Sequence, residues 1–330
     1  MKLQASITIP PLSPSLHHQQ SIMLIGSCFT EHIGNFLADG KFPVLQNPHG
    51  ILFDPASVCH SLLSYIQQHT YTDADLFYLN ETWNSWAHHS RFSHPDKATC
   101  LQNINASQAA ASAFLKKADW LIITLGSSYS YRLQQPPHTA VANCHKAPLQ
   151  TFHKHLCTIE ETVTALDGVL YQLFRYNPSI QVLFTISPVR HLRDGLVENN
   201  KSKARLIEAV HHLVQKFNKL HYFPAYELVV DVLRDYRFYD IDLAHPNYLA
   251  TQYVMEEFTK YAMQPATIAL LEEIKQLNIA KKHRSSHPTS QLHLRFLASQ
   301  LARARNLQAQ HPNLNFSEEL SYFGGHPLGE

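Results

Sequence analysis

The sequence predicts an α/β protein whose doubly wound parallel sheet of about five strands lies in a three-layer α/β/α arrangement, followed by a helical C-terminal extension. Short apolar runs that end in Gly or Ser are typical of strands buried on both faces of a sheet. These runs alternate with segments of helical periodicity, which favours parallel strands joined by right-handed crossovers. The expected strands cover residues 22–25, 42–45, 118–125, 181–186 and 226–232.

The helices between these strands are predicted from apolar spacing and from capping residues. Apolar residues at i, i+4, i+7 and i+8 begin at Phe29, and Gly40 ends this first helix. Asp54 followed by Pro55 is typical of a helix cap and first helical position. Further helices are expected over residues 106–118, 159–175 and 203–217, with a last one ending near residue 263.

The chain is expected to divide into three parts. Residues 1–20, rich in Pro, Ser and Gln, form an arm that covers part of the molecule, residues 21–263 form the main domain, and residues 264–330 form the helical extension. Within the main domain, residues 76–93 follow neither period and predict an irregular excursion or a small hairpin over the sheet edge. Within the extension, residues 281–288 read as a solvated linker between two helices.

The composition excludes several classes of protein. Hydrophobic residues make up 45% of the 330 residues and charged residues 16%, which indicates a globular chain. The 27 basic and 26 acidic side chains leave a net charge of +1, which argues against a nucleic-acid partner. No apolar run has the length of a signal peptide or a membrane span, so we expect a cytoplasmic protein with no membrane partner.

Cysteine and histidine usage bears on cofactors. The five cysteines are an odd number without a close-spaced pair, which predicts reduced thiols. The 23 histidines are numerous, but a metal centre needs three or four convergent ligands. We therefore expect neither a metal nor another cofactor.

Polar residues that could carry chemistry follow the expected strands. Ligands of open parallel sheets bind outside the carboxyl ends of the strands. The candidates that share this position are Ser27, Cys28, Gly50, Gly126, Ser127, Ser128, His191, Asp242 and His245.

Two of these groups predict acyl-transfer chemistry. Gly26 allows a sharp turn from a strand into a helix, and the helix amino terminus that follows favours a developing anion beside Ser27 and Cys28. The spacing Asp242-x-x-His245 can hold a carboxylate against an imidazole, so that the other ring nitrogen faces a nucleophile. The alternative is that Asp242 and His245 only cap a turn and a helix.

Seven short stretches together carry a family resemblance. They are Ile25-Gly26-Ser27-Cys28-Phe29-Thr30, Asn47-Pro48-His49-Gly50-Ile51-Leu52, His89-Ser90-x-Phe92-Ser93, Thr124-Leu125-Gly126-Ser127, Asn143-Cys144-His145-Lys146, Ser187-Pro188-Val189-Arg190-His191 and Asp242-x-x-His245-Pro246-Asn247. Over residues 20–260 the chain resembles the GSCFA family within the SGNH (GDSL-like) hydrolase superfamily. This resemblance implies a flavodoxin-like sheet and an esterase-type catalytic arrangement.

The chain departs from the superfamily at two blocks. Aligning Gly26-Ser27-Cys28 with the superfamily's Gly-Asp-Ser places Cys28 at the nucleophile position, and Ser27 remains the alternative nucleophile. The third block offers Gly-x-Asn in the superfamily, whereas Gly126-Ser127-Ser128 places Ser128 at the amide donor of the oxyanion site. Gly50 resembles the second-block glycine, whose amide also holds the oxyanion, and the amide of Cys28 would supply another donor.

Other residues of these motifs are expected to line the pocket, although structural roles are equally open to them. Arg190 could hold a carboxylate or a phosphate through its two-pronged guanidinium. Trp83, Trp86 and Tyr129 could pack against an acyl chain or a sugar, or could cover the core. The remaining expected lining residues are His89, Ser90, Asn143, His145 and His191.

The sequence therefore predicts an acyl-ester hydrolase or an acyltransferase acting on a small-molecule or glycan acyl ester. Cys28 or Ser27 would attack the acyl carbonyl, with His245 as the base and Asp242 orienting it. The alternative is a catalytically inactive ligand-binding protein on an SGNH-like scaffold.

Overall fold

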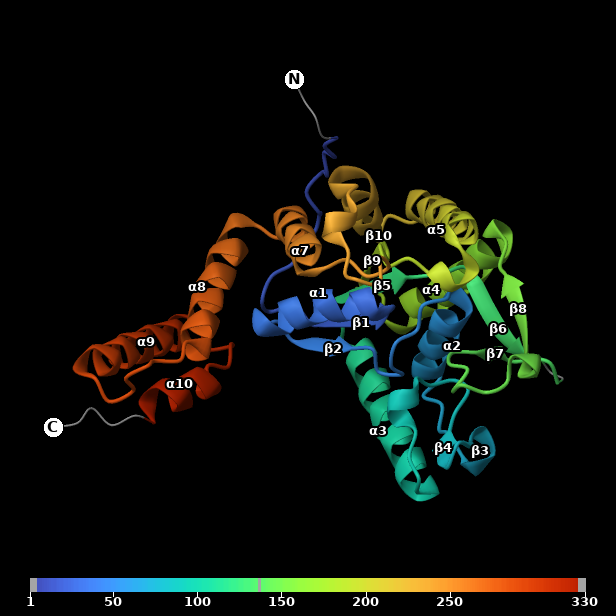
Figure 1. Ribbon diagram of the computed structural model, residues 1–330, viewed down its shortest axis with the longest axis horizontal. Helices are drawn as coiled ribbons and strands as arrows, with labels where there is room; N and C mark the ends of the chain where they lie inside the picture. Colours follow the sequence, from blue (N-terminus) through green and yellow to red (C-terminus); the bar gives the residue numbers. More distant parts are fainter. Residues whose placement is uncertain (1–4, 136–137, 326–330) are drawn as a thin grey trace.

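The computed structural model describes residues 5–135 and 138–325, and a five-stranded parallel sheet forms its centre (Figure 1). The strand order β2-β1-β5-β9-β10 is the doubly wound order of flavodoxin-like proteins, which confirms the predicted fold class. The strands are β1 (Ile22–Gly26), β2 (Val44–Gln46), β5 (Trp120–Leu125), β9 (Gln181–Ile186) and β10 (Leu220–Phe223).

Helices cover both faces of this sheet, because successive strand residues point to opposite sides. Leu24 and Ile122 lie in one hydrophobic core, whereas Met23 and Ile123 lie in the other. The first core packs against α1 (Cys28–Asp39) and α7 (Tyr248–Ala262). The second core packs against α2 (Pro55–Ile66), α3 (Lys97–Leu115), α4 (Ile159–Tyr176) and α5 (Leu196–Lys216).

The prediction of a strand over residues 226–232 is wrong. The last strand is β10, which ends before Pro224, and the following residues form α6 (Ala225–Glu227) and the π-helical segment η5 (Leu228–Leu233). The buried side chains Leu228, Val229 and Val232 lie on one side of this segment, as helical spacing requires. The loop with Asp242 and His245 therefore follows helical turns rather than a strand.

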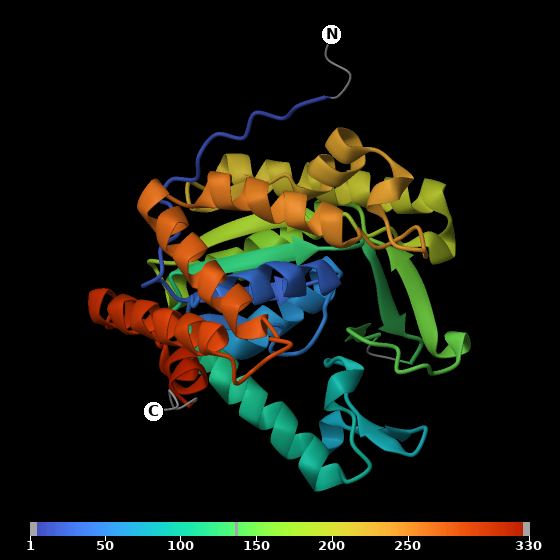
Figure 2. The same ribbon diagram turned by 60° about the vertical axis from the view of Figure 1, so that its left-hand side comes forward.

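Two small antiparallel units extend beyond the parallel sheet (Figure 2). The hairpin of β3 (Phe77–Leu79) and β4 (Thr82–Asn84) confirms the small hairpin expected within residues 76–93. The sheet of β6 (Tyr129–Leu133), β7 (Ala140–Val141) and β8 (Phe152–Leu156) was not predicted, although Tyr129 and Tyr131 alternate with polar residues as a strand would.

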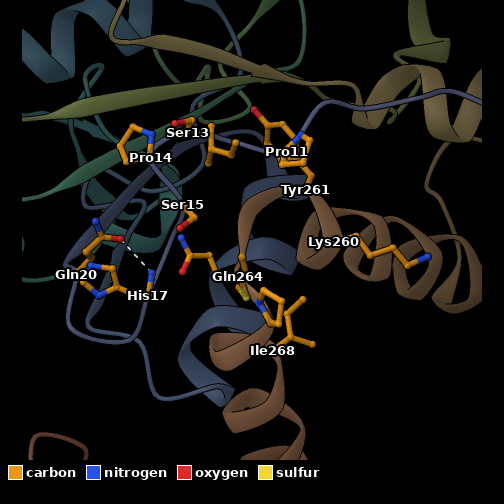
Figure 3. Close-up of a pocket in the computed structure, with 13 residues that line it drawn as sticks. Pro11, Ser13, Pro14, Ser15, His17, Gln20, Lys260, Tyr261, Gln264 and Ile268 are labelled. Atoms are coloured by element: carbon orange, nitrogen blue, oxygen red, sulfur yellow. Dashed lines mark hydrogen bonds between the residues drawn. The ribbon is translucent and has the colours of Figure 1, made fainter.

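The amino-terminal arm is fastened along α7. The amide of Leu12 donates to the Tyr261 carbonyl (2.8 Å) and that of Leu16 to the Ala262 carbonyl (2.7 Å). A cavity of about 650 Å³ lies between the arm and the junction of α7 with α8, with Pro11, Tyr261 and Ile268 on its walls (Figure 3). The arm leads into the first residue of β1, so this cavity lies toward the amino-terminal edge of the sheet. Ser27 and Cys28 follow the other end of β1.

The C-terminal extension consists of α8 (Pro265–Lys282), α9 (Gln291–Gln310) and α10 (Ser317–Gly324), which enclose their own hydrophobic cluster. Figure 1 shows these helices to one side of the parallel sheet. The buried Glu319 carboxylate pairs with Lys41 (2.9 Å), which lies between α1 and β2. In the described parts of the chain, no helix combines the length and the apolar character that crossing a membrane requires.

Candidate functional site

The turn from β1 into α1 requires glycine at Gly26. Its φ is +152°, and a Cβ added there would lie 2.2 Å from the Thr124 carbonyl oxygen of the neighbouring strand. The Gly26 amide donates to Asn47 Oδ1 (2.9 Å), and its carbonyl accepts from the Leu52 amide (2.9 Å). Three chain segments thus hold the backbone that presents Ser27 and Cys28.

Ser27 and Cys28 differ in exposure. The Ser27 side chain is buried at the N-cap of α1, makes no side-chain capping bond, and its hydroxyl has no hydrogen-bond partner among the described residues. Cys28 is partly exposed, at the first position of α1. Burial raises the pKa of the Cys28 thiol, whereas the Phe29 amide and the Lys203 charge act to lower it.

Asp242 and His245 form the closest acid-base pair of the site. Asp242 Oδ2 lies 2.6 Å from His245 Nδ1, while Oδ1 accepts from the amides of Ala244 (2.9 Å) and His245 (3.0 Å). These hydrogen bonds lower the pKa of Asp242 to about 2, so the carboxylate is ionised at neutral pH. This arrangement leaves His245 Nε2 as the ring nitrogen that faces away from the carboxylate.

The residues predicted from separate strand ends converge at the carboxyl edge of the sheet. A Cβ added at Gly126 would lie 3.3 Å from both His191 Nε2 and Ser27 Cβ. The charge of His245 acts to lower the pKa of both His32 on α1 and His191. Across the described residues, no hydrogen bond joins His245 to the Ser27 hydroxyl or the Cys28 thiol, and catalytic hydrogen bonds are often long before substrate binds.

The expected oxyanion donors are engaged within the protein. The Gly50 amide donates to the Asn47 carbonyl (2.7 Å), and the Gly126 amide donates to the Phe53 carbonyl (2.7 Å). The fully buried Ser128 hydroxyl donates to the Ser202 carbonyl of α5 (3.1 Å). The amides of Cys28 and Phe29, in the first turn of α1, have no acceptor within their helix.

The other expected lining residues occupy two regions. His89 lies against Gly50, since a Cβ added at Gly50 would be 2.1 Å from His89 Cβ. Arg190 donates its amide to Ala244 (3.0 Å) and places its guanidinium over the Tyr239 ring.

Asn143 and His145 belong to a different packing unit, beside the β3–β4 hairpin. Asn143 Oδ1 accepts from the His145 amide (2.8 Å), and His145 Nε2 bonds the Ser85 carbonyl (2.9 Å). The side chains of Trp83, Trp86 and Tyr129 also make packing contacts within the protein, with Lys97, Phe77 and Lys154 respectively. Contact of any of these residues with a substrate stays a prediction.

One buried polar face of α5 was missed at the sequence level. The Asn199 carboxamide accepts from the His191 amide (2.9 Å), and the Ser202 hydroxyl accepts from the Ser128 amide (2.8 Å). Lys203 Nζ donates to the carbonyls of Gly126 (2.5 Å) and Ser187 (2.6 Å). The signal was present, because polar residues at i, i+3 and i+4 share one helix face.

Within the described ranges, one group of side chains could hold a metal ion: His155, Cys157 and Glu161, whose ligand atoms lie within 4.8 Å of one another. His155 Nε2 already lies 2.8 Å from Glu161, whose carboxylate also accepts from the Thr158 amide (2.7 Å) at the start of α4. These contacts account for the geometry, and the group takes no part in the site at the α1 turn.

The fold and these residues define a three-layer α/β protein with a Ser-Cys turn and an Asp-His pair at the carboxyl edge of its sheet. The chain belongs to the GSCFA family: the model of that family matches residues 21–258, and the model of the GSCFA domain protein C-terminal domain matches residues 274–324.

Distant similarities among the solved structures include the following two. A structure from Streptococcus pneumonia named for a platelet activating factor is 12% identical, with 74% of this chain and 84% of that chain covered at a TM-score of 0.40. An acetyl xylan esterase (Est2A) from the rumen bacterium Butyrivibrio proteoclasticus is 11% identical, with 74% and 63% covered at a TM-score of 0.38. No curated protein matches the chain significantly.

Proposed function

We propose that the protein transfers or hydrolyses acyl groups, with Cys28 as the nucleophile, His245 as the general base and Asp242 as the residue that orients it. The observation that carries the proposal is the 2.6 Å contact between Asp242 and His245 Nδ1. Such a contact fixes the tautomer in which Nε2 can accept a proton. His245 is also close enough to His32 and His191 to affect the pKa of both.

Exposure favours Cys28 over Ser27 as the nucleophile. A nucleophile must reach the acyl carbonyl, and Cys28 is partly exposed whereas only 3% of Ser27 is. A thiol is also intrinsically more nucleophilic than a hydroxyl. Ser27 remains the second candidate, because its hydroxyl has no hydrogen-bond partner among the residues described.

The reaction proceeds in two steps. Cys28 Sγ bonds to the acyl carbon as its proton passes to His245 Nε2, which returns the proton to the departing alcohol. Water or an acceptor alcohol then gives its proton to the same nitrogen and attacks the thioester. The bond from the acyl carbon to Sγ breaks, and His245 Nε2 passes the proton to Sγ, which restores the thiol. The amides of Cys28 and Phe29 stabilise the oxyanion in both steps, since the predicted donors at Gly50 and Ser128 bond to protein acceptors.

The test is hydrolysis of a short p-nitrophenyl ester and of an acyl thioester by Cys28→Ala, Ser27→Ala and His245→Ala variants. We expect Cys28→Ala and His245→Ala to lose at least about 100-fold in kcat/KM, whereas Ser27→Ala keeps most of it. An Asp242→Asn variant is assayed as well, with Asp235→Asn as its matched control. Asp235 lies in the same loop and caps the turn at Tyr236–Phe238. Full activity in His245→Ala would refute the mechanism.

A ligand-binding protein on the same scaffold is the second candidate. The observation that favours it is the missing hydrogen bond between His245 and either nucleophile in the described structure. This candidate predicts that an acyl probe reactive toward thiols and hydroxyls leaves the folded protein unlabelled at both Ser27 and Cys28. Labelling of Cys28 that depends on His245 would exclude it.

A further inference from the structure

His155, Cys157 and Glu161 form a cluster of three metal-ligating side chains where β8 ends and α4 begins. Their ligand atoms lie within 4.8 Å of one another. His155 lies in β8 and Cys157 follows two residues later, and alternate residues of an extended chain point to the same side. Glu161 reaches this side from the first turn of α4. An imidazole, a thiol and a carboxylate from seven consecutive residues thus meet at one point.

Hydrogen bonds hold the backbone and the carboxylate of this cluster. Arg205 of α5 donates to the carbonyls of Leu156 (2.8 Å) and Cys157 (2.9 Å), which fixes the chain beside the thiol. The Glu161 carboxylate accepts from the Thr158 amide (2.7 Å) in the capping box of α4. The ligands are therefore positioned before any ion binds, which lowers the free-energy cost of assembling a metal site.

The mixed ligand set selects the kind of ion. Mg²⁺ and Ca²⁺ prefer oxygen ligands, whereas a set of one nitrogen, one sulfur and one oxygen suits Zn²⁺. The Thr158 amide and His155 lower the pKa of the Glu161 carboxyl, so this ligand is a carboxylate at neutral pH. A Cys157 thiolate and the Glu161 carboxylate together balance the two positive charges of the ion.

The spacing of the ligand atoms fits a tetrahedral ion after small movements of the side chains. Bonds of about 2.0–2.3 Å place tetrahedral ligand atoms about 3.3–3.8 Å apart. His155 Nε2 and Glu161 Oε2 are 2.8 Å apart and would separate slightly, while the widest spacing, at most 4.8 Å, would close by about 1 Å. The side chains of His155 and Glu161 are 29% and 44% exposed, which leaves room for this movement and for water as a fourth ligand.

We propose that His155, Cys157 and Glu161 bind one Zn²⁺ ion, with water in the fourth position. On binding, Cys157 Sγ releases its proton to solvent, and bonds to the ion replace the hydrogen bond between His155 and Glu161. The ion joins the end of β8 to the first turn of α4. The site is separate from Cys28, Asp242 and His245, so the inference does not rest on the proposed function. It departs from the absence of a metal expected from the sequence, because a histidine count does not show which ligands converge.

The experiment titrates the protein, freed of metal by a chelator, with Co²⁺ as a spectroscopic probe of the zinc site. A Co²⁺ ion bound by a thiolate has a charge-transfer absorption in the near ultraviolet, which added Zn²⁺ should abolish by displacing the probe. We expect one such Co²⁺ per chain in the wild type, no absorption in Cys157→Ser, and an affinity at least about tenfold lower in His155→Ala. A wild type without this absorption, or an absorption that persists in Cys157→Ser, would overturn the proposal.

A Glu161→Gln variant tests the site without changing the buried thiol. Glutamine also serves at this position of a capping box, so the start of α4 is kept, but a neutral amide is a poorer ligand for Zn²⁺ than a carboxylate. We expect the circular dichroism of the wild type and an affinity for Co²⁺ at least about tenfold lower. Zn²⁺ should also raise the midpoint of thermal unfolding less in this variant than in the wild type. Wild-type affinity in Glu161→Gln would count against the proposal.

Two controls establish where the ion binds. His153→Ala changes the preceding histidine on the same side of β8, whose ring centre lies 6.4 Å from that of His155, and should bind Co²⁺ as the wild type does. Cys28→Ser removes the partly exposed thiol of the α1 turn and should keep the absorption. Loss of the absorption in Cys28→Ser with retention in Cys157→Ser would place the ion at the α1 turn and refute the inference.

Discussion

Replacing Gly26 by alanine is expected to destabilise the protein by about 4 kcal/mol, from the sum of two effects. The backbone is held at φ +152°, where a non-glycine residue costs about 1–3 kcal/mol. The new methyl would also lie 2.2 Å from the carbonyl oxygen and 2.8 Å from the amide nitrogen of Thr124. These are backbone atoms of β5, paired in register with β1, so relief of the overlap disturbs the sheet and costs about 1–3 kcal/mol more.

The assay is urea unfolding followed by circular dichroism, with Gly168→Ala as the matched control. Gly168 is an exposed position within α4, and a Cβ added there would meet nothing within 4 Å. The same Gly→Ala exchange should therefore stabilise the protein at this position by about 0.5–1 kcal/mol. A Gly26→Ala variant within about 1 kcal/mol of the wild type would refute the steric reasoning, since backbone strain and overlap together exceed that figure.

Two further predictions concern buried ionisable groups, His49 and Glu319. Burial lowers the pKa of His49 to about 3. Between pH 6.5 and pH 3 the unfolded chain therefore binds a proton at His49 that the folded chain does not bind, so the free energy of unfolding should fall as the pH drops through this range. At pH 5 the loss of stability is about 2 kcal/mol. Urea unfolding at pH 7 and pH 5 should therefore show a smaller decrease in the free energy of unfolding for His49→Gln than for the wild type, and an equal decrease in both would contradict the prediction. Glu319→Gln should cost about 2 kcal/mol by leaving Lys41 without its buried partner, whereas Glu272→Gln, at an exposed pair, should cost under about 0.5 kcal/mol in the same assay. Equal costs would show that burial adds nothing to the Glu319 pair.

The elements that the sequence predicted well are those whose signal is local. The strand over residues 181–186 and the cap at Asp54 were recognisable because apolar runs and capping side chains act on their immediate neighbours. The run at residues 226–232 was misread because β-branched residues favour a strand in general, while burial against the sheet selected a helical path here.

The features of the candidate site that could be predicted are likewise those with a local signal. The Gly26 turn and the pair of Asp242 and His245 could be predicted, since each depends on a few consecutive residues. The buried contacts of Ser202 and Lys203 could not, because their hydrogen-bond partners lie more than 15 residues away along the chain and come together only in the folded sheet. Polar residues on the inner face of a helix were the available sign.

Several polar groups at the carboxyl edge of the sheet form hydrogen bonds within the protein, whereas others are left for the proposed reaction. The Asn47 side chain accepts a hydrogen bond from the Gly26 amide, and the Lys203 side chain donates to the carbonyls of Gly126 and Ser187. Gly50 and Ser128 likewise donate to protein acceptors, the carbonyls of Asn47 and Ser202. The amides of Cys28 and Phe29, which have no acceptor within their helix, are then the oxyanion donors of the proposed mechanism, and the helix dipole adds to them. An acyl group bound at Cys28 would thus place its oxyanion over the helix terminus, which ties both the nucleophile and its stabilisation to the turn at Gly26.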